Sequence, residues 1–168
     1  MAFNTKYLQW LAAGLLIPSG ICQAADLQSE PRYADISRGN VAAITQIGNY
    51  NKTRIDQNGS SQKLEQIQTG TRNQAVISQN GTANLAYVQQ TGRNNDLTLT
   101  HTGSYNQASV VQNGTSNSAV VAQTGAYNRA YVNQYGTGNQ ASVQQTGLNG
   151  TATVTQHGNN STASVKQW

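Results

Sequence analysis

From residue 40 onward, apolar and polar positions alternate along short stretches that repeat every eleven residues. Between Ala86 and Gln90, Ala, Val and Gln occupy every second position, with Tyr and Gln between them. Successive side chains of a strand point to opposite faces, so the first set shares one face. A helix would need apolar residues three and four apart, which this pattern does not supply. The spacing therefore predicts one strand in each unit.

A column of glutamines defines the register of the repeat. In steps of eleven from Gln46, eleven of twelve anchor positions are Gln, and the exception is His101. Ala stands four residues before nine of the twelve anchors, and an aliphatic residue stands two before eleven, Gln66 being the exception. The glutamine anchors are Gln46, Gln57, Gln68, Gln79, Gln90, Gln112, Gln123, Gln134, Gln145, Gln156 and Gln167.

Turn residues separate the predicted strands. Gly stands two residues after each of the first eleven anchors, and Asn stands six residues before nine of the twelve. Both residues tolerate positive φ, so each unit is predicted to be one short strand and one tight arc. The turn glycines are Gly48, Gly59, Gly70, Gly81, Gly92, Gly103, Gly114, Gly125, Gly136, Gly147 and Gly158. After Asn40, the asparagines are Asn51, Asn73, Asn84, Asn95, Asn106, Asn117, Asn128 and Asn139.

Two facing units form a coil of 22 residues, and twelve strands give about six coils. We predict an all-β, cross-β-like β-solenoid, with equivalent residues stacked in parallel strands about 4.7–4.9 Å apart. Ala and aliphatic side chains would fill a thin core between two sheets. Buried Gln and Asn amides would each bond the same amide one coil away, because an unpaired one costs about 1–3 kcal/mol. These columns are the predicted structural ladder.

The first 24 residues have the pattern of a secretory signal peptide. A Lys near the start precedes an apolar stretch too short for a comfortable membrane span, and small residues at Cys22 and Ala24 fit cleavage after Ala24. Ile21 disfavours a lipoprotein, because a Gly or Ala is expected before an acylated cysteine. Residues 25–39 are interpreted as a disordered export or address segment, in preference to a cover over the first coil. Residues 40–168 form the predicted solenoid.

Composition narrows the function. Charged residues make up 10% of the chain, the net charge is +4, and the basic residues are scattered singly. Nucleic acid and anionic membranes are therefore disfavoured as partners. Cys22 is the only cysteine, so the processed chain has no disulfide, thiol catalyst or cysteine metal site.

Candidate chemical residues are few. His101 and His157 have no carboxylate or second His at ligand spacing, so a catalytic or metal role is disfavoured. Asp56, Glu65 and Asp96 fall at outward positions of three different strands, where solvation explains them better than an acid pair. We expect no enzyme, no cofactor, no metal site and no small-molecule substrate.

The pattern Gln-x-Gly-x-x-Asn-x-Ala-x-x-x-Gln, as in QTGAYNRAYVNQ from Gln123 to Gln134, resembles the curlin repeat of bacterial curli fibres. The resemblance covers residues 40–168. It implies a secreted amyloid subunit on the surface of a Gram-negative bacterium, exported through an outer-membrane pore with accessory proteins. It also implies assembly with itself and with a homologous curlin subunit into biofilm matrix.

The curlin family has a major, fibre-forming subunit and a minor subunit that nucleates it. This chain lacks a Gly-rich leader, is basic and carries the motif in nearly every half-coil, which is more similar to the minor subunit. Its last repeat is close to regular and holds only Lys166, whereas the minor subunit often ends in a strongly basic repeat. The minor subunit is favoured, and the major subunit stays open. A monomeric β-solenoid adhesin, which would need capped ends, is the alternative from another class.

Overall fold

The computed structural model describes residues 39–168. The chain divides into two units, Met1–Glu30 and Pro31–Trp168, and all described residues belong to the second. The predicted signal peptide, and all but the last residue of the predicted lead-in, lie outside the described residues. Within residues 39–168 no helix is long and apolar enough to cross a membrane.

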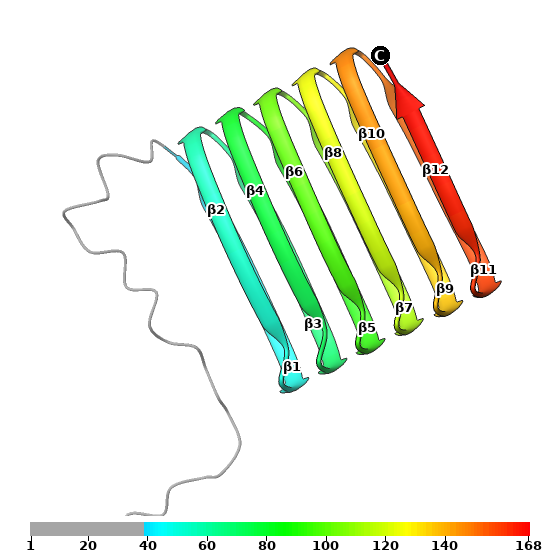
Figure 1. Ribbon diagram of the computed structural model, residues 1–168. Coiled ribbons are helices and arrows are strands. Elements are labelled where there is room, and N and C mark those ends of the chain that lie inside the picture. Colours follow the sequence, from blue (N-terminus) through cyan, green and yellow to red (C-terminus); the bar gives the residue numbers. More distant parts are fainter. Residues whose placement is uncertain (1–38) are drawn as a thin grey trace, which may run out of the picture. The chain divides into compact units, whose positions relative to one another are not determined.

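Twelve strands follow one another along the described chain, as Figure 1 shows. They are β1 Val41–Asn49, β2 Lys52–Ser60, β3 Lys63–Thr71, β4 Gln74–Thr82, β5 Leu85–Arg93, β6 Asp96–Ser104, β7 Gln107–Thr115, β8 Ser118–Ala126, β9 Arg129–Thr137, β10 Gln140–Leu148, β11 Thr151–Asn159 and β12 Thr162–Gln167.

The strands form two parallel sheets of six strands each. The odd sheet has the order β1-β3-β5-β7-β9-β11, and the even sheet has the order β2-β4-β6-β8-β10-β12. Each residue pairs with the residue 22 positions further on, as Gln90 with Gln112 and Val121 with Val143. The stack of coils in Figure 1 confirms the predicted β-solenoid of about six 22-residue coils.

The core is a thin layer between the sheets, formed by every second residue of the strands from β3 to β11, whereas β1 is exposed and β2 and β12 are only half-buried at these positions. In β5, Ala86, Val88 and Gln90 are buried, while Leu85 is exposed and Tyr87 is half-buried. The alternation follows from the two-residue period of a strand. Aliphatic residues fill the middle of the layer, and one anchor residue per strand, Gln in every strand except β6, lies at its border toward the arc.

The strands are longer than predicted, and the arcs are correspondingly shorter. Nine of the eleven residues of most units pair in the sheets, and β12 has six. The motif asparagines do not have positive φ, although the residue type tolerates it. The left-handed residue is the one before each asparagine, such as Tyr105 with φ 58° before Asn106. A buried asparagine in this position keeps ordinary φ and uses its side chain instead.

The turn glycines are required by close backbone approach as well as by φ. Gly92 has φ +116°, and a Cβ built on it would overlap the carbonyl oxygen of Gly114 in the next coil. The same overlap recurs for most of the glycine column. An alanine there would therefore have to push two coils apart.

Candidate functional site

Stacked amides of the odd sheet form a continuous ladder. Each Nε2 donates to the Oε1 of the glutamine one coil further on, at N···O distances of 2.6–2.9 Å. The ladder joins Gln46, Gln68, Gln90, Gln112, Gln134 and Gln156. From the second member on, the same Nε2 also donates to a backbone carbonyl of the facing even strand, at 2.8–3.2 Å. The odd ladder thus ties the coils to one another and the two sheets together.

The even ladder is interrupted. Gln57 donates to Gln79 at 2.8 Å, and a second segment runs through Gln123, Gln145 and Gln167 at 2.7 Å per bond. Between the two segments stands His101, which has no exposed surface.

Neither ring nitrogen of His101 has a hydrogen-bond partner, and the Oε1 of Gln123 also has none. Burial lowers the pKa of His101 from 6.5 to about 4, and the neighbouring Gln123 side chain opposes this shift in part, although no bond of good geometry forms. The neutral form is therefore the one that fits the core at neutral pH.

The asparagines act differently from the predicted amide-to-amide ladder. Within residues 39–168 only three Asn–Asn side-chain bonds form, from Asn95, Asn117 and Asn128 to the asparagine one coil earlier. The regular bonds go to backbone instead. For example, Asn106 Nδ2 donates to the carbonyl of Gly125 at 3.0 Å, and its Oδ1 accepts the N–H of Asn128 at 3.2 Å. Each asparagine therefore fastens an arc to the backbone of the next arc.

The first two coils hold a partly buried polar cluster that the repeat pattern did not predict. Thr53 replaces the motif alanine in β2, and its hydroxyl accepts from Gln66 Nε2 at 2.6 Å and from Gln46 Nε2 at 3.0 Å, and donates to Gln68 Oε1 at 3.0 Å. Gln66 is the one anchor-minus-two residue that is not aliphatic. Thr53 and Gln66 face each other and form a hydrogen bond. The two departures from the repeat pattern were therefore the sequence feature that could have indicated this cluster.

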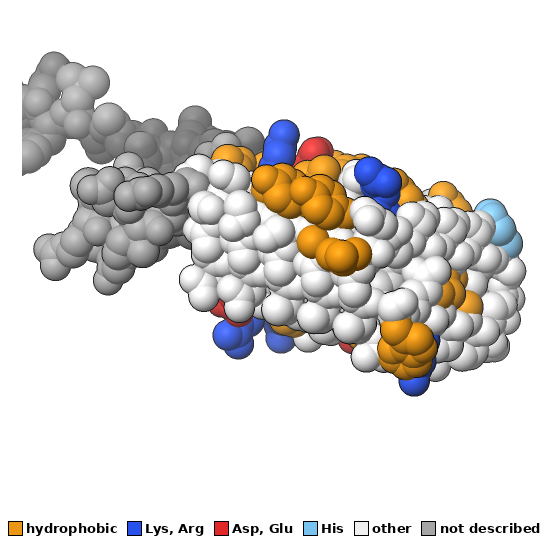
Figure 2. All heavy atoms as spheres, turned by 90° about the horizontal axis from the view of Figure 1, so that it is seen from above, with side chains coloured by type: hydrophobic (Ala, Val, Ile, Leu, Met, Phe, Trp, Pro, Cys, Tyr) orange, Lys and Arg blue, Asp and Glu red, His pale blue; other side chains and the backbone are white. Residues whose placement is uncertain are grey.

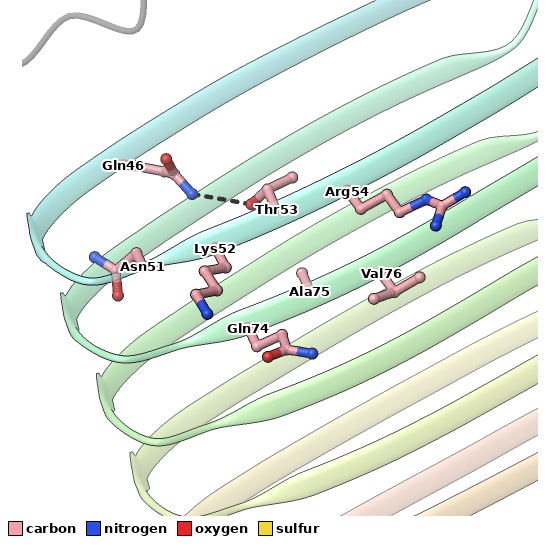
Figure 3. A pocket seen from close by; sticks show the side chains of 8 residues that line it. All are labelled: Gln46, Asn51, Lys52, Thr53, Arg54, Gln74, Ala75 and Val76. Atoms are coloured by element: carbon pink, nitrogen blue, oxygen red, sulfur yellow. Dashed lines mark hydrogen bonds between the residues drawn. The ribbon is translucent and has the colours of Figure 1, made fainter.

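A pocket opens beside this cluster, and Figure 3 shows its lining with the bond from Gln46 to Thr53. Its described lining includes Lys52 and Arg54 but no His, Cys, Asp or Glu. Residues 39–168 likewise contain no group of three side chains of those types placed to hold a metal ion.

The outer surface is mostly neutral. Figure 2 shows one edge of the stack, where separate basic groups and a few hydrophobic side chains lie among neutral polar ones. Aromatic residues stack in register, with ring centroids 5.0 Å apart for Tyr105 and Tyr127 and 4.9 Å for Tyr135 and His157. The three predicted outward acids are exposed, and Asp56 pairs with Arg54 at 3.0 Å. The most regular feature of the described chain is therefore its set of polar columns, and the candidate site is the stack itself.

The fold and these columns define a parallel β-solenoid whose coils are joined by amide side chains. A family model described as the curlin associated repeat matches residues 70–103 and 103–136. The chain is thus a curlin-repeat protein, and the two adjacent matches support its place in the curlin family as a curli-type structural subunit. Comparison with curated proteins gives no match, and comparison with solved structures gives none.

Proposed function

We propose that the chain is a secreted amyloid subunit of curli-type surface fibres, and that it is the minor subunit that nucleates a homologous major subunit. The observation that carries the proposal is the repeat register at the two ends of the stack. β1 and β2 at one end, and β11 and β12 at the other, each pair on one side only within residues 39–168. Such strand edges are templates for another chain.

The two ends are complementary. Six coils of 22 residues cover 132 positions, so a copy added after β11 and β12 places its Gln46 one coil beyond Gln156. By the same spacing its Ile44 follows Val154, and its Gly48 follows Gly158. A second chain would continue the odd ladder, the aliphatic core and the glycine column without a change of register. This supports growth by end-to-end addition.

Nucleation follows from the cost of building a first coil. Ordering about 22 residues costs roughly 1–2 kcal/mol per residue in backbone entropy before ladder contacts offset it. A folded curlin-repeat stack presents a finished edge and removes much of this barrier for a soluble subunit. The motif in nearly every half-coil and the basic charge favour the minor subunit.

The cellular setting belongs to the same proposal. Residues 1–24 would direct secretion, and residues 25–39 would serve as the export segment recognised at an outer-membrane pore and its accessory proteins. The secreted chain, residues 25–168, would then join the extracellular fibre of a Gram-negative bacterium. Its chemistry is structural and needs no cofactor.

A seeding experiment tests the proposed role. A trace of folded secreted chain is added to a separate soluble curlin subunit, and thioflavin fluorescence is followed. The nucleator predicts a shorter lag with an unchanged final fibre yield. A chain that fibrillises readily alone but leaves the partner's lag unchanged would be a major subunit instead. A chain that stays monomeric at high concentration and does not seed would be an adhesin.

A further inference from the structure

Side chains in the arcs fasten each coil to the following one. We call the residue six places before each anchor the clamp residue. Asn117 is an example: its Nδ2 donates to the carbonyl of Gly136, 19 residues on, at 3.0 Å. Its Oδ1 accepts the N–H of Asn139, 22 residues on, at 3.1 Å. One clamp residue thus supplies two bonds to the backbone of the next coil.

The first of these bonds occurs at every clamp position from 40 to 139, including Gln62, whose Nε2 reaches Gly81 at 3.0 Å. The second bond occurs at every clamp asparagine from Asn40 to Asn139 but not at Gln62, whose Oε1 has no partner within the described chain. All of these bonds point toward the following coil. The attachment of a coil to whatever follows it therefore depends on its own two clamp residues.

The coil formed by β11 and β12 departs from this rule at both arcs. Its clamp residues are Gly150, which has no side chain, and Ser161, whose side chain is shorter than that of Asn. Their backbone N–H groups still donate to the preceding coil, at 2.9 Å to Asn128 and 3.0 Å to Asn139. This coil is held by the stack but offers no clamp beyond it.

The rest of the same coil keeps the repeat intact. Ala152, Val154 and Gln156 lie in the core column and remain at least 95% buried. Gly158 keeps φ +103° and meets nothing within 4 Å on its open side. The departure is confined to the clamps, so it changes the strength of a junction without changing its register.

At a junction between copies, the added copy's Asn51 would follow Ser161 and its Asn40 would follow Gly150. Three bonds present between internal coils would then be missing. At the Ser161 position, the bond that accepts the Asn51 N–H and the bond that donates to the Gly48 carbonyl would be missing. At the Gly150 position, the bond that accepts the Asn40 N–H would be missing. The glutamine ladder and the backbone pairing would remain.

We infer that Gly150 and Ser161 weaken the end-to-end junction between two copies of this chain relative to its internal coil contacts, which limits self-polymerisation. The inference rests on the proposed end-to-end addition. The partner that binds the edge formed by β11 and β12 is a second copy of this chain, because the first coil of the chain carries the matching glutamine, aliphatic and glycine positions. A chain with this property forms short or reversible homopolymers while keeping a regular edge.

The test restores the clamp. Ser161→Asn allows two of the missing bonds and adding Gly150→Asn allows the third. Gly150 does not have positive φ, and the nearest atom to a new Cβ there is the terminal Oδ1 of Asn128, at 2.9 Å. The matched control is Ser164→Asn, the same substitution at an exposed position of β12. The secreted chain is incubated with each change, and the soluble concentration left at the plateau is measured.

The inference predicts that S161N lowers the residual soluble concentration by about tenfold, that G150N/S161N lowers it further, and that S164N leaves it at the parent value. Denaturant unfolding of the dilute monomer measures any gain in monomer stability. If the parent assembles and S161N and G150N/S161N match S164N, the inference is overturned while end-to-end addition stands. If no variant assembles or seeds at any concentration, end-to-end addition fails and the inference fails with it. Assembly by S161N alone would support both.

Discussion

The odd and even ladders have the same backbone register but different hydrogen bonding. In the odd sheet six glutamines bond without interruption, and five of them also bond the facing strand. In the even sheet His101 divides the ladder, and Gln123 next to it donates to Gln145 but accepts from no partner. The parallel pairing across the break is nevertheless regular, with His101 opposite Gln79 and Gln123.

The difference between the two ladders distinguishes the interactions that maintain the fold from those that add stability to it. Backbone pairing and the aliphatic core carry the stack past His101 without loss of register. The amides then add stability in proportion to the bonds that each one completes. We expect the odd ladder to be the main source of this added stability, and the even ladder to contain a weak point at its third coil.

The largest expected effect comes from breaking the intact ladder. Gln112 donates to Gln134 and to the Asp96 carbonyl and accepts from Gln90. Q112A should lower the free energy of unfolding by about 2–4 kcal/mol, because it creates a void and leaves a buried oxygen unpaired.

The matched change in the other ladder is Q123A, which creates a void of the same size but removes one amide hydrogen bond where Q112A removes three. It should therefore lower the free energy of unfolding less, by about 1–2 kcal/mol. Denaturant titration of the monomers measures both changes. The control Q107A, at an outward position of β7, should stay within about 0.5 kcal/mol of the parent. Equal losses from Q112A and Q123A would contradict the ranking of the ladders.

A second prediction concerns acid. The folded chain keeps His101 neutral down to pH about 4, whereas the unfolded chain protonates it near 6.5. Between these values the unfolded state binds one more proton, so stability is complete above pH 6.5 and falls as the pH decreases toward 4. The total loss is about 3 kcal/mol. Unfolding measured across this range for the parent and for H101Q checks it, and a parallel pH dependence in the two chains would assign the effect to other groups.

The third and smallest prediction repairs the break. H101Q gives Gln79 an amide acceptor and supplies a donor for the unpaired Oε1 of Gln123. Two new bonds should raise the free energy of unfolding at neutral pH by about 2 kcal/mol. Thermal or denaturant unfolding detects this gain, and H101A serves as the control that removes the ring without restoring the ladder. A gain in H101A equal to that in H101Q would mean that relief of the buried ring, and not the ladder, is responsible.

The strict period made the architecture predictable, because an eleven-residue repeat with a two-residue alternation leaves few other ways to bury Ala, Val and Gln together. The interruption of the even ladder was also predictable from the sequence, since His101 is the one anchor that is not Gln. The arc conformation was not predictable in detail. The positive φ belongs to Tyr105, the residue before Asn106, and not to Asn106 itself. The Asn106 side chain instead forms hydrogen bonds with backbone atoms 19 and 22 residues away. Such bonds depend on the spacing of neighbouring coils, which no local pattern contains.

The cluster around Thr53 shows the same limit. Thr53 and Gln66 each depart from the repeat pattern in the sequence. Only the structure shows that β2 and β3 face each other, so that the Thr53 hydroxyl accepts a hydrogen bond from Gln66 Nε2 at 2.6 Å. The clamp positions Gly150 and Ser161 were also readable as departures from the asparagine column. Their consequence required knowing that every clamp bond points toward the following coil.

The central claim is that copies of this chain add end to end in the register of the internal coils, and paired cysteines test it most directly. Residues 25–168 contain no cysteine. One batch carries Ile47→Cys and the other His157→Cys, both at exposed outward positions of edge strands. In register these residues are adjacent, at a strand spacing of about 4.8 Å that a disulfide accommodates. Mixed fibres oxidised after assembly should yield I47C–H157C linked dimers and few dimers of either variant with itself. Dimers of I47C with I47C, or of H157C with H157C, as the main products would contradict end-to-end addition in register.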